Sequence, residues 1–193
     1  MYTGDDYELA GFIVGVVEKE SIINGENIRA GDKIIGLPSS GLHTNGYSLV
    51  RRVFGDTRKD LEIYYPELEK TLGEELLTPH RCYFNQVKPI LPLVKGMAHI
   101  TGGGLVDNVP RVLPEGLMAV FDSHSWSVPP VFELIRERGG IDGGEMYRVF
   151  NMGIGMTVFC SADDAAAITR AIPEAEIVGE VERQRGDKRV VIG

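Results

Sequence analysis

The segment of residues 36–47, GLPSSGLHTNGY, constrains the fold and function of this sequence more than any other stretch. It contains three glycines, two adjacent serines, a threonine, an asparagine and a histidine. It follows a short apolar run at residues 33–37 and precedes an apparent helix over residues 47–54. A helix start leaves backbone N–H groups unpaired and carries partial positive charge, and glycines let such amides approach a ligand. The pattern therefore predicts a loop that binds an anionic group, usually a phosphate.

The same residue types also cap helices without any ligand, so an ordinary connection between a strand and a helix is the alternative. The stretch of small and polar residues is longer than capping requires, and we favour the anion site. His43 lies inside this loop, where it could donate to a phosphate or act as an acid or base near neutral pH. A loop histidine that bonds to a backbone carbonyl is an equally good interpretation.

A second glycine-rich segment, TGGG at residues 101–104, follows His99 and precedes an expected helix over residues 105–112. A lone run of three glycines is typical of a flexible turn. Two loops of this kind in one chain make a pair of polar walls around a shared ligand more plausible. We expect His99 to have a structural role beside this loop.

Several kinds of site are excluded by the spacing of the reactive residues. The four histidines do not group with carboxylates at metal-ligand spacing, so we expect no metal site built by this chain. His80 and His124 have no supporting neighbours, and we assign them no role. Cys82 and Cys160 lie in unlike contexts and are expected to be reduced thiols. The sequence contains neither GxSxG nor a P-loop GxxxxGK[ST] motif.

The composition is that of an ordinary soluble protein, with 43% hydrophobic and 25% charged residues. The formal net charge of −8 argues against nonspecific nucleic-acid binding, which needs a basic surface. There is no charged-then-apolar leader, and the aliphatic runs are too short to cross a bilayer. We expect a soluble, cytoplasmic protein that binds neither membranes nor nucleic acid.

Strand and helix patterns interleave along the chain, which predicts an α+β fold with a mixed sheet covered by helices in three layers. Pro89 and Pro92 should bend or split the helix that contains them. We expect the last two strands to form a hairpin whose basic tip, around Gly186-Asp187, is solvated. The expected strands cover residues 8–19, 33–37, 97–101, 117–122, 154–160, 176–183 and 188–192, and the expected helices residues 47–54, 67–77, 79–95, 105–112, 129–138, 144–150 and 162–171.

Four segments together resemble the phosphoribosylformylglycinamidine cyclo-ligase family, also called AIR synthetase. They occur in the family's order, and the resemblance covers essentially the whole chain. The segments are GLPSSGLHTNGYSLVRRV (36–53), LLTPHRCY (76–83), HITGGGLVDNVPRVLP (99–114) and EMYRVFNMGIGM (145–156).

The resemblance implies an ATP-dependent ring closure in purine biosynthesis that converts formylglycinamidine ribonucleotide to aminoimidazole ribonucleotide. ATP phosphorylates the formyl oxygen, and the ribosyl-bearing amidine nitrogen then attacks the activated carbon, releasing ADP and phosphate. The full-length family enzyme uses ATP with Mg²⁺ and forms a homodimer. Such an enzyme mainly positions two anionic molecules and neutralises developing charge, which suits glycine loops at helix starts.

Matching position by position, the resemblance places both glycine-rich loops at the interdomain cleft, on the side of the substrate's ribose 5-phosphate. His43 is the best candidate for a catalytic or transition-state contact. Asp107 stands where the family pattern has glutamate, a change of little consequence. The candidate phosphate-binding residues are Ser39, Ser40, Gly41, Thr44, Asn45 and Gly46 in the first loop and Thr101, Gly102, Gly103 and Gly104 in the second.

The resemblance also divides the chain. Residues 1–20 resemble the last strand of the family's N-terminal ATP-binding domain, and residues 21–193 resemble its C-terminal domain. The rest of the N-terminal domain supplies the nucleotide-binding lysine and the acidic metal ligands in the family. We therefore expect neither ATP nor Mg²⁺ to bind to this chain alone, and no turnover by it. The strand at residues 8–19 should be exposed, disordered or paired with another chain.

Two other functions are compatible with these patterns. The chain could be a stand-alone module that binds phosphorylated metabolites without catalysis. It could also belong to another ATP-using enzyme with the same two-lobe plan, such as a kinase or synthetase, although the serine pair and the three glycines disfavour this.

Overall fold

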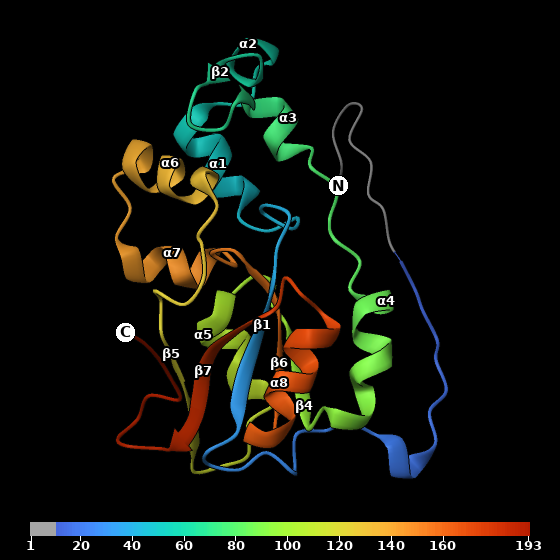
Figure 1. Ribbon diagram of the computed structural model, residues 1–193. Coiled ribbons are helices and arrows are strands. Elements are labelled where there is room, and N and C mark those ends of the chain that lie inside the picture. The colour runs from blue at the N-terminus through green and yellow to red at the C-terminus, as the bar shows by residue number, and fades with distance from the viewer. Residues whose placement is uncertain (1–10) are drawn as a thin grey trace.

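Six strands form one mixed sheet in the computed structural model, which describes residues 11–193 (Figure 1). Their order is β4-β6-β1-β7-β5-β8. All neighbouring strands are antiparallel except β5 and β8, which are parallel. The predicted α+β class with a mixed sheet is confirmed. The strands are β1 (Lys33–Pro38), β4 (Gly96–His99), β5 (Leu117–Phe121), β6 (Ile154–Cys160), β7 (Glu176–Arg183) and β8 (Val190–Ile192).

Helices cover both faces of this sheet and make the three predicted layers (Figure 1). Strand β1 is apolar on both sides, so Ile34 packs into one core and Ile35 into the other. Burying such side chains contributes about 1.5–3 kcal/mol each, which favours the layered arrangement. The core around Ile34 is covered by α5 (Gly104–Asn108) and η3 (Val109–Arg111), and the core around Ile35 by α4 (Phe84–Val87), η2 (Lys88–Leu93) and α8 (Ala162–Ala171).

A third core lies in a helical lobe beyond one end of the sheet (Figure 1). Val50, Phe132 and Phe150 are fully or almost fully buried in it. The glycine-rich loop at residues 39–46 connects β1 to this lobe, so it lies between the lobe and the sheet. The lobe contains α1 (Tyr47–Phe54), α2 (Arg58–Leu61), the strand pair β2 (Tyr64–Tyr65) and β3 (Lys70–Thr71), α3 (Leu72–Leu76), α6 (Pro130–Gly139) and α7 (Gly143–Val149).

The elements nearest the C-terminus agree best with the prediction. Strands β6 and β7 and helix α8 have the expected bounds. Helix α8 starts after Ser161, whose hydroxyl accepts from the Asp164 backbone N–H. Such a cap is a local signal that the sequence displays.

Two predicted helices are shorter than expected. The helix expected at residues 79–95 begins only at Phe84 as α4 and continues as the 3₁₀ helix η2, so the predicted effect of Pro89 and Pro92 is confirmed. Residues 78–83 are not helical. The helix expected at residues 67–77 is reduced to α3, because Glu69 has a φ of 56° and the chain first forms β3.

The predicted C-terminal hairpin is wrong. Strands β7 and β8 do not pair with each other, because β5 lies between them: Ala119 is opposite Val181 on one side and Val190 on the other. The tip around Gly186-Asp187 is nevertheless exposed, as predicted, over residues 185–188. The Arg189 guanidinium donates to the carbonyls of Leu113 and Pro114, both at 2.7 Å, and so holds the connection against η3.

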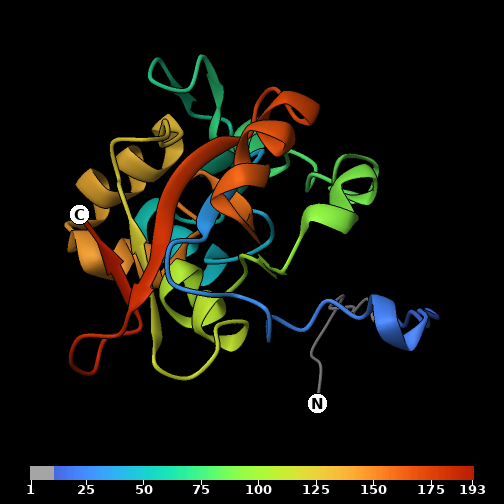
Figure 2. The ribbon, with the colours of Figure 1, turned by 60° about the horizontal axis from the view of Figure 1, so that its bottom comes forward.

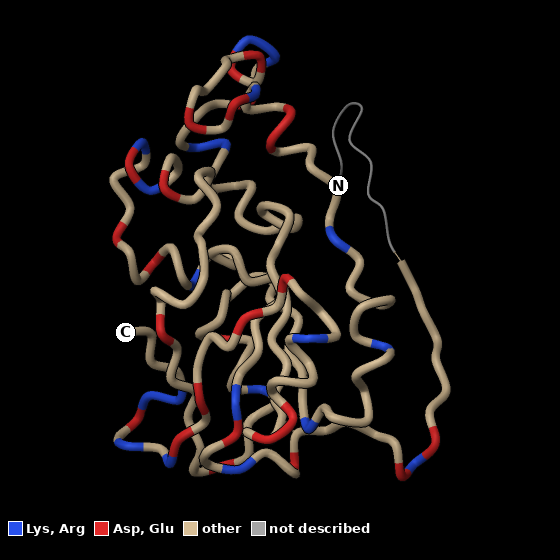
Figure 3. Tube along the Cα trace, viewed as in Figure 1, with Lys and Arg blue, Asp and Glu red and all other residues tan. Residues whose placement is uncertain are grey.

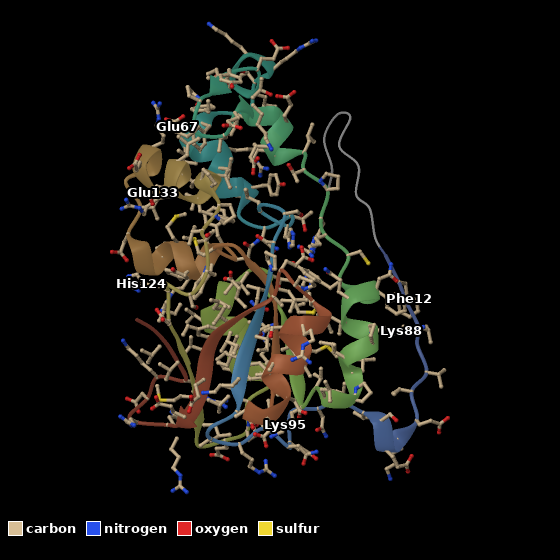
Figure 4. All side chains as sticks on the ribbon, viewed as in Figure 1. Phe12, Glu67, Lys88, Lys95, His124 and Glu133 are labelled. Atoms are coloured by element: carbon tan, nitrogen blue, oxygen red, sulfur yellow. The ribbon has the colours of Figure 1, made fainter. Side chains whose placement is uncertain are left out.

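The N-terminal segment projects from the body of the molecule (Figure 2). Residues 11–18 are not a strand, and η1 (Lys19–Ser21) follows them; residues 8–10 of the predicted strand lie outside the described residues. Phe12 is 95% exposed and Val16 is 99% exposed, so the predicted exposure is confirmed for the described residues (Figure 4 labels Phe12). Within residues 11–193, every helix is too short or too polar to traverse a lipid bilayer.

Candidate functional site

The two glycine-rich loops leave the sheet at the same end. Strands β1 and β4 are both antiparallel to β6, so they run in the same direction. The first loop follows the C-terminal end of β1, and the second follows the C-terminal end of β4 at His99. The direction of these two strands therefore places both loops at the same end of the sheet. No Lys, Arg, Asp or Glu lies between Gly36 and Val50, and Figure 3 shows this junction largely free of charged residues.

The first loop is held by a buried amide from a distant part of the chain. The side chain of Asn151, 2% exposed, donates from Nδ2 to the Gly41 carbonyl at 2.8 Å. Its Oδ1 accepts from the Ser39 hydroxyl and from the Gly153 backbone N–H, both at 2.9 Å. Each of these contacts satisfies a polar group at the base of the loop. The loop is thus fixed by the protein itself.

His43 is also integrated into the loop. The Ser40 backbone N–H donates to His43 Nε2 at 2.9 Å, so Nε2 is unprotonated and the proton of the neutral ring is on Nδ1. Nδ1 is buried and has no hydrogen-bond partner among residues 11–193. Burial, followed by the proximity of His80, His99 and Arg81, lowers the pKa of His43 from 6.5 to about 4. His43 is therefore neutral at physiological pH.

Two residues of the loop have unusual backbone conformations. His43 has a φ of 52° and Thr44 a φ of 62°. The left-handed region is unfavourable for a β-branched residue such as Thr44. The Thr44 hydroxyl and the Asn45 side-chain amide both donate to the His43 carbonyl, at 2.6 and 2.7 Å. Strain of this kind is concentrated at ligand-binding sites, and these contacts maintain it here.

The second loop has its own buried asparagine. Asn108, 4% exposed, donates from Nδ2 to the Gly104 carbonyl at 2.8 Å and accepts from the Thr101 hydroxyl at 3.0 Å. Gly104 has a φ of 58°, and a Cβ there would lie 2.0 Å from the Tyr147 carbonyl oxygen. Only glycine fits this close approach between the loop and α7.

The two loops face each other. A Cβ built on Gly102 would lie 3.5 Å from Asn45 Oδ1, so the glycine run of one loop adjoins the side chain of the other. The backbone N–H groups of Gly102 and Gly103 have no hydrogen-bond partner among the described residues, and neither do those of Thr44 and Gly46. The amides of Ser39, Ser40, Asn45 and Gly104 are bonded within the protein. The two loops thus form the predicted pair of facing polar segments, and about half of the backbone amides named here are free to donate to a ligand.

Two cations near the first loop are paired, whereas the Asp107 carboxylate beside Gly103 has no ion-pair partner among the described residues. Arg81 forms an ion pair with Glu174, and Lys70 forms one with Glu75, whose carboxylate lies close to Gly41. An anion at this junction would therefore be bound mainly by the free backbone amides, because the hydroxyls of the two loops all donate within the protein. Such donors fix the position of an anion.

Three of the four histidines meet beside the first loop, which the sequence did not indicate. The rings of His43 and His80 are stacked, with centroids 4.0 Å apart. The Nε2 atoms of His80 and His99 are 3.1 Å apart. One ring nitrogen from each of the three lies within 4.8 Å of the others, a spacing compatible with a shared metal ion. The sequence analysis expected no metal site because it looked for histidines grouped with carboxylates, whereas these three histidines group with one another.

The structure brings together all the predicted site residues at one junction, because both loops and His43 lie between the sheet and the lobe. It also adds Asn151, Asn108 and His80, which the sequence analysis did not assign to the site. Their contacts join segments distant in sequence, and no local pattern encodes them. A cavity of about 670 Å³ lies elsewhere, lined by Arg148 and Lys188 among others.

Comparison with known proteins agrees with this geometry. Residues 29–192 match the family described as AIR synthase related protein, C-terminal domain. The chain belongs to this family. The resemblance noted from the four sequence motifs is therefore confirmed. Both glycine-rich loops and all three clustered histidines lie within the matched residues of this AIR synthase C-terminal domain.

Two similar relatives are both named phosphoribosylformylglycinamidine cyclo-ligase. That of Desulfotalea psychrophila is 47% identical over 201 residues, which is 100% of this chain and 56% of the relative. That of Geobacillus kaustophilus is 49% identical over 193 residues, which is 96% of this chain and 56% of the relative. The chain spans about half the length of the curated relatives it matches.

Solved structures support the fold. A thiamine-monophosphate kinase from Stenotrophomonas maltophilia matches 91% of this chain and 54% of its own, with a TM-score of 0.61 and 12% identity. A chain described as AaThiL complexed with AMPPCP and TMP matches 87% of this chain and 49% of its own, with a TM-score of 0.56 and 17% identity. At these identities the similarity concerns the fold alone, and it agrees with the α+β class.

Proposed function

We propose that this chain is the substrate-binding half of a phosphoribosylformylglycinamidine cyclo-ligase, which converts formylglycinamidine ribonucleotide to aminoimidazole ribonucleotide. One observation carries the proposal: the chain matches cyclo-ligases at 47–49% identity. The two glycine-rich loops support it, because they face each other and have backbone N–H groups without hydrogen-bond partners among the described residues. The substrate's 5-phosphate suits donors of this kind, because helix starts and glycine amides bind phosphate.

In this proposal the chain positions the substrate. The Gly102 and Gly103 amides, with Thr44 and Gly46 opposite, bind the phosphate, while Asn151 and Asn108 keep the loops in place. We assign His43 the transition-state contact; in the free chain its proton is on the buried Nδ1, because Nε2 already accepts from Ser40. Holding the amidine nitrogen close to the formyl carbon lowers the entropic barrier to ring closure.

The remaining functions belong to the part of the enzyme that this chain does not match. An N-terminal domain would supply the ATP site with Mg²⁺ and most of a homodimer interface, with residues 1–20 contributing its last strand. ATP, when bound there, supplies the phosphoryl group that activates the formyl oxygen. The exposed apolar residues Phe12 and Val16 support this arrangement, because such side chains normally pack against a partner. The location would be the cytoplasm.

Reconstitution tests the proposal. The chain is mixed with the N-terminal portion of the Geobacillus kaustophilus cyclo-ligase that it does not match, and aminoimidazole ribonucleotide formation is measured. We expect turnover by the mixture and none by either part alone. Turnover by this chain alone, or no turnover by a mixture shown to associate, would contradict the proposal. Calorimetry with ribose 5-phosphate separates the rival function, since binding by the isolated chain supports a stand-alone binding module.

A matched pair of glycine variants tests the loops. Gly102→Ala places a methyl group beside Asn45 without a backbone clash, whereas Gly143→Ala places one in open space. We expect the first variant to raise the KM for formylglycinamidine ribonucleotide at least about tenfold, a cost of roughly 1.4 kcal/mol, with an unchanged melting temperature. The second should leave KM unchanged. Equal KM values in the two variants would exclude the loops as the substrate site.

A further inference from the structure

The three clustered histidines come from three separate segments. His43 belongs to the first glycine-rich loop, His80 to the irregular segment at residues 78–83, and His99 to the end of β4. Their ring nitrogens lie within 4.8 Å of one another, and the Nε2 atoms of His80 and His99 are 3.1 Å apart. Neutral imidazole is among the commonest ligands of metal ions in proteins. The function proposed above uses only His43 of this cluster, with its proton on Nδ1, and so describes the metal-free chain.

Two of the three ligands are already at metal-binding distance from each other. A tetrahedral site with metal–nitrogen bonds of about 2.0–2.1 Å places its ligand atoms roughly 3.3–3.4 Å apart. The Nε2 atoms of His80 and His99 are close to this value, and a bridging proton or a metal ion can occupy the space between them. His80 is solvent-accessible and lies outside any helix or strand, so its ring can rotate to complete the geometry.

His43 can become the third ligand through a change of tautomer. Its Nδ1 is buried and has no hydrogen-bond partner among the described residues. Its Nε2 lies 2.9 Å from both the backbone nitrogen and the hydroxyl of Ser40, and this hydroxyl donates to the Pro79 carbonyl at 2.8 Å. Binding through Nδ1 moves the proton to Nε2, where the Ser40 hydroxyl oxygen accepts it, and the Ser40 backbone N–H gives up its bond to Nε2. A metal-bound histidine generally donates its other N–H in this way.

The donor set selects the kind of ion. Three neutral nitrogens without a carboxylate suit borderline ions such as Zn²⁺, Co²⁺, Ni²⁺ and Cu²⁺, whereas Mg²⁺ and Ca²⁺ prefer oxygen ligands. A three-histidine site also leaves a fourth position for water or an anionic oxygen.

We propose that His43, His80 and His99 form a binding site for one divalent transition-metal ion, with Zn²⁺ as the best fit and one coordination position open. The site is distinct from the Mg²⁺ assigned above to the N-terminal domain, and it depends on neither ATP nor turnover.

Metal titration of the chain as it stands tests this site. Zn²⁺ binding is measured by calorimetry, and Co²⁺ binding by the strong visible absorption of four- or five-coordinate Co²⁺. The variant His80→Gln removes one ligand outside both glycine-rich loops, and His99→Gln removes a second. The control His124→Gln removes an exposed histidine that is not part of the cluster (Figure 4 labels His124). Thermal unfolding followed by circular dichroism verifies that each variant is folded.

We expect the wild type and His124→Gln to bind one Zn²⁺ per chain with the same affinity and to give the strong Co²⁺ spectrum. His80→Gln and His99→Gln should each bind roughly tenfold more weakly or worse and lose this spectrum. Equal Zn²⁺ affinity in the wild type and folded His80→Gln would overturn the proposal. A Co²⁺ spectrum in the wild type identical to that of the free hydrated ion would overturn it as well.

Discussion

Asn151 and Gly41 are 110 positions apart, yet the Asn151 side-chain amide donates to the Gly41 carbonyl at 2.8 Å. This bond ties the end of the helical lobe to the glycine-rich loop that leaves β1. The same side chain accepts from Ser39 and Gly153, so one buried residue satisfies three groups around the loop. The conformation of the loop is therefore a property of the folded body.

Replacing Asn151 with alanine should destabilise the chain by about 1–3 kcal/mol, because it leaves the buried groups that it bonds without partners. Urea denaturation measures this free energy of unfolding. The control is Asn24→Ala, since Asn24 is exposed and its side chain accepts only from the Glu26 backbone N–H. We expect the control to cost less than about 0.5 kcal/mol. Equal losses in the two variants would show that Asn151 does not fix the loop.

Gly104 and Gly140 offer a matched pair for the second loop. Their φ angles are 58° and 57°, so alanine at either position suffers the same backbone strain of about 1–2 kcal/mol. Only at Gly104 would the added methyl lie 2.0 Å from a carbonyl oxygen, that of Tyr147. We expect Gly104→Ala to lower the free energy of unfolding by at least about 1 kcal/mol more than Gly140→Ala. Similar values in thermal or urea unfolding would refute this close approach.

Stability should fall in mild acid because of the histidine cluster. Burial lowers the pKa of His43 to about 4 in the folded chain, whereas in the unfolded chain it stays near 6.5. Between these pH values the unfolded chain binds more protons, so the stability is complete above pH 6.5 and is lost as the pH falls toward 4. At about 1.4 kcal/mol per pKa unit, His43 contributes on the order of 3 kcal/mol to this loss.

Urea unfolding across this pH range, with a chelator present to exclude metal ions, tests the effect. His43→Gln should flatten the pH dependence, and His80→Gln should flatten it less, because burial also lowers the pKa of His80. His124→Gln should leave the slope unchanged. A slope in His43→Gln as steep as that of the wild type would assign the acid sensitivity to other groups.

The sequence predicted those parts of the fold that depend on local signals. The predicted bounds of β6, β7 and α8 agree with the structure, and Ser161 caps the start of α8. Prolines were also informative, since Pro89 and Pro92 convert the end of α4 into a 3₁₀ helix. Both loops were recognised because glycine, serine and threonine gather in short stretches.

What the sequence could not provide was pairing between distant segments. A turn signal at Gly186 indicated a hairpin, but β5 lies between β7 and β8, where its residues Met118, Ala119 and Phe121 are buried. The meeting of His43, His80 and His99 likewise depends on three segments converging in space. The roles of Asn108 and Asn151 also depend on partners that are distant or hidden in the sequence.

The two buried asparagines have a consequence for how a ligand is captured. Because Asn108 and Asn151 hold the loops before anything binds, the amides that remain free are already oriented. An incoming anion then loses little affinity to ordering the chain, and the complex should form with a small change in conformational entropy. Anion binding at this junction is thus expected to occur at a preformed site, without ordering of the loops.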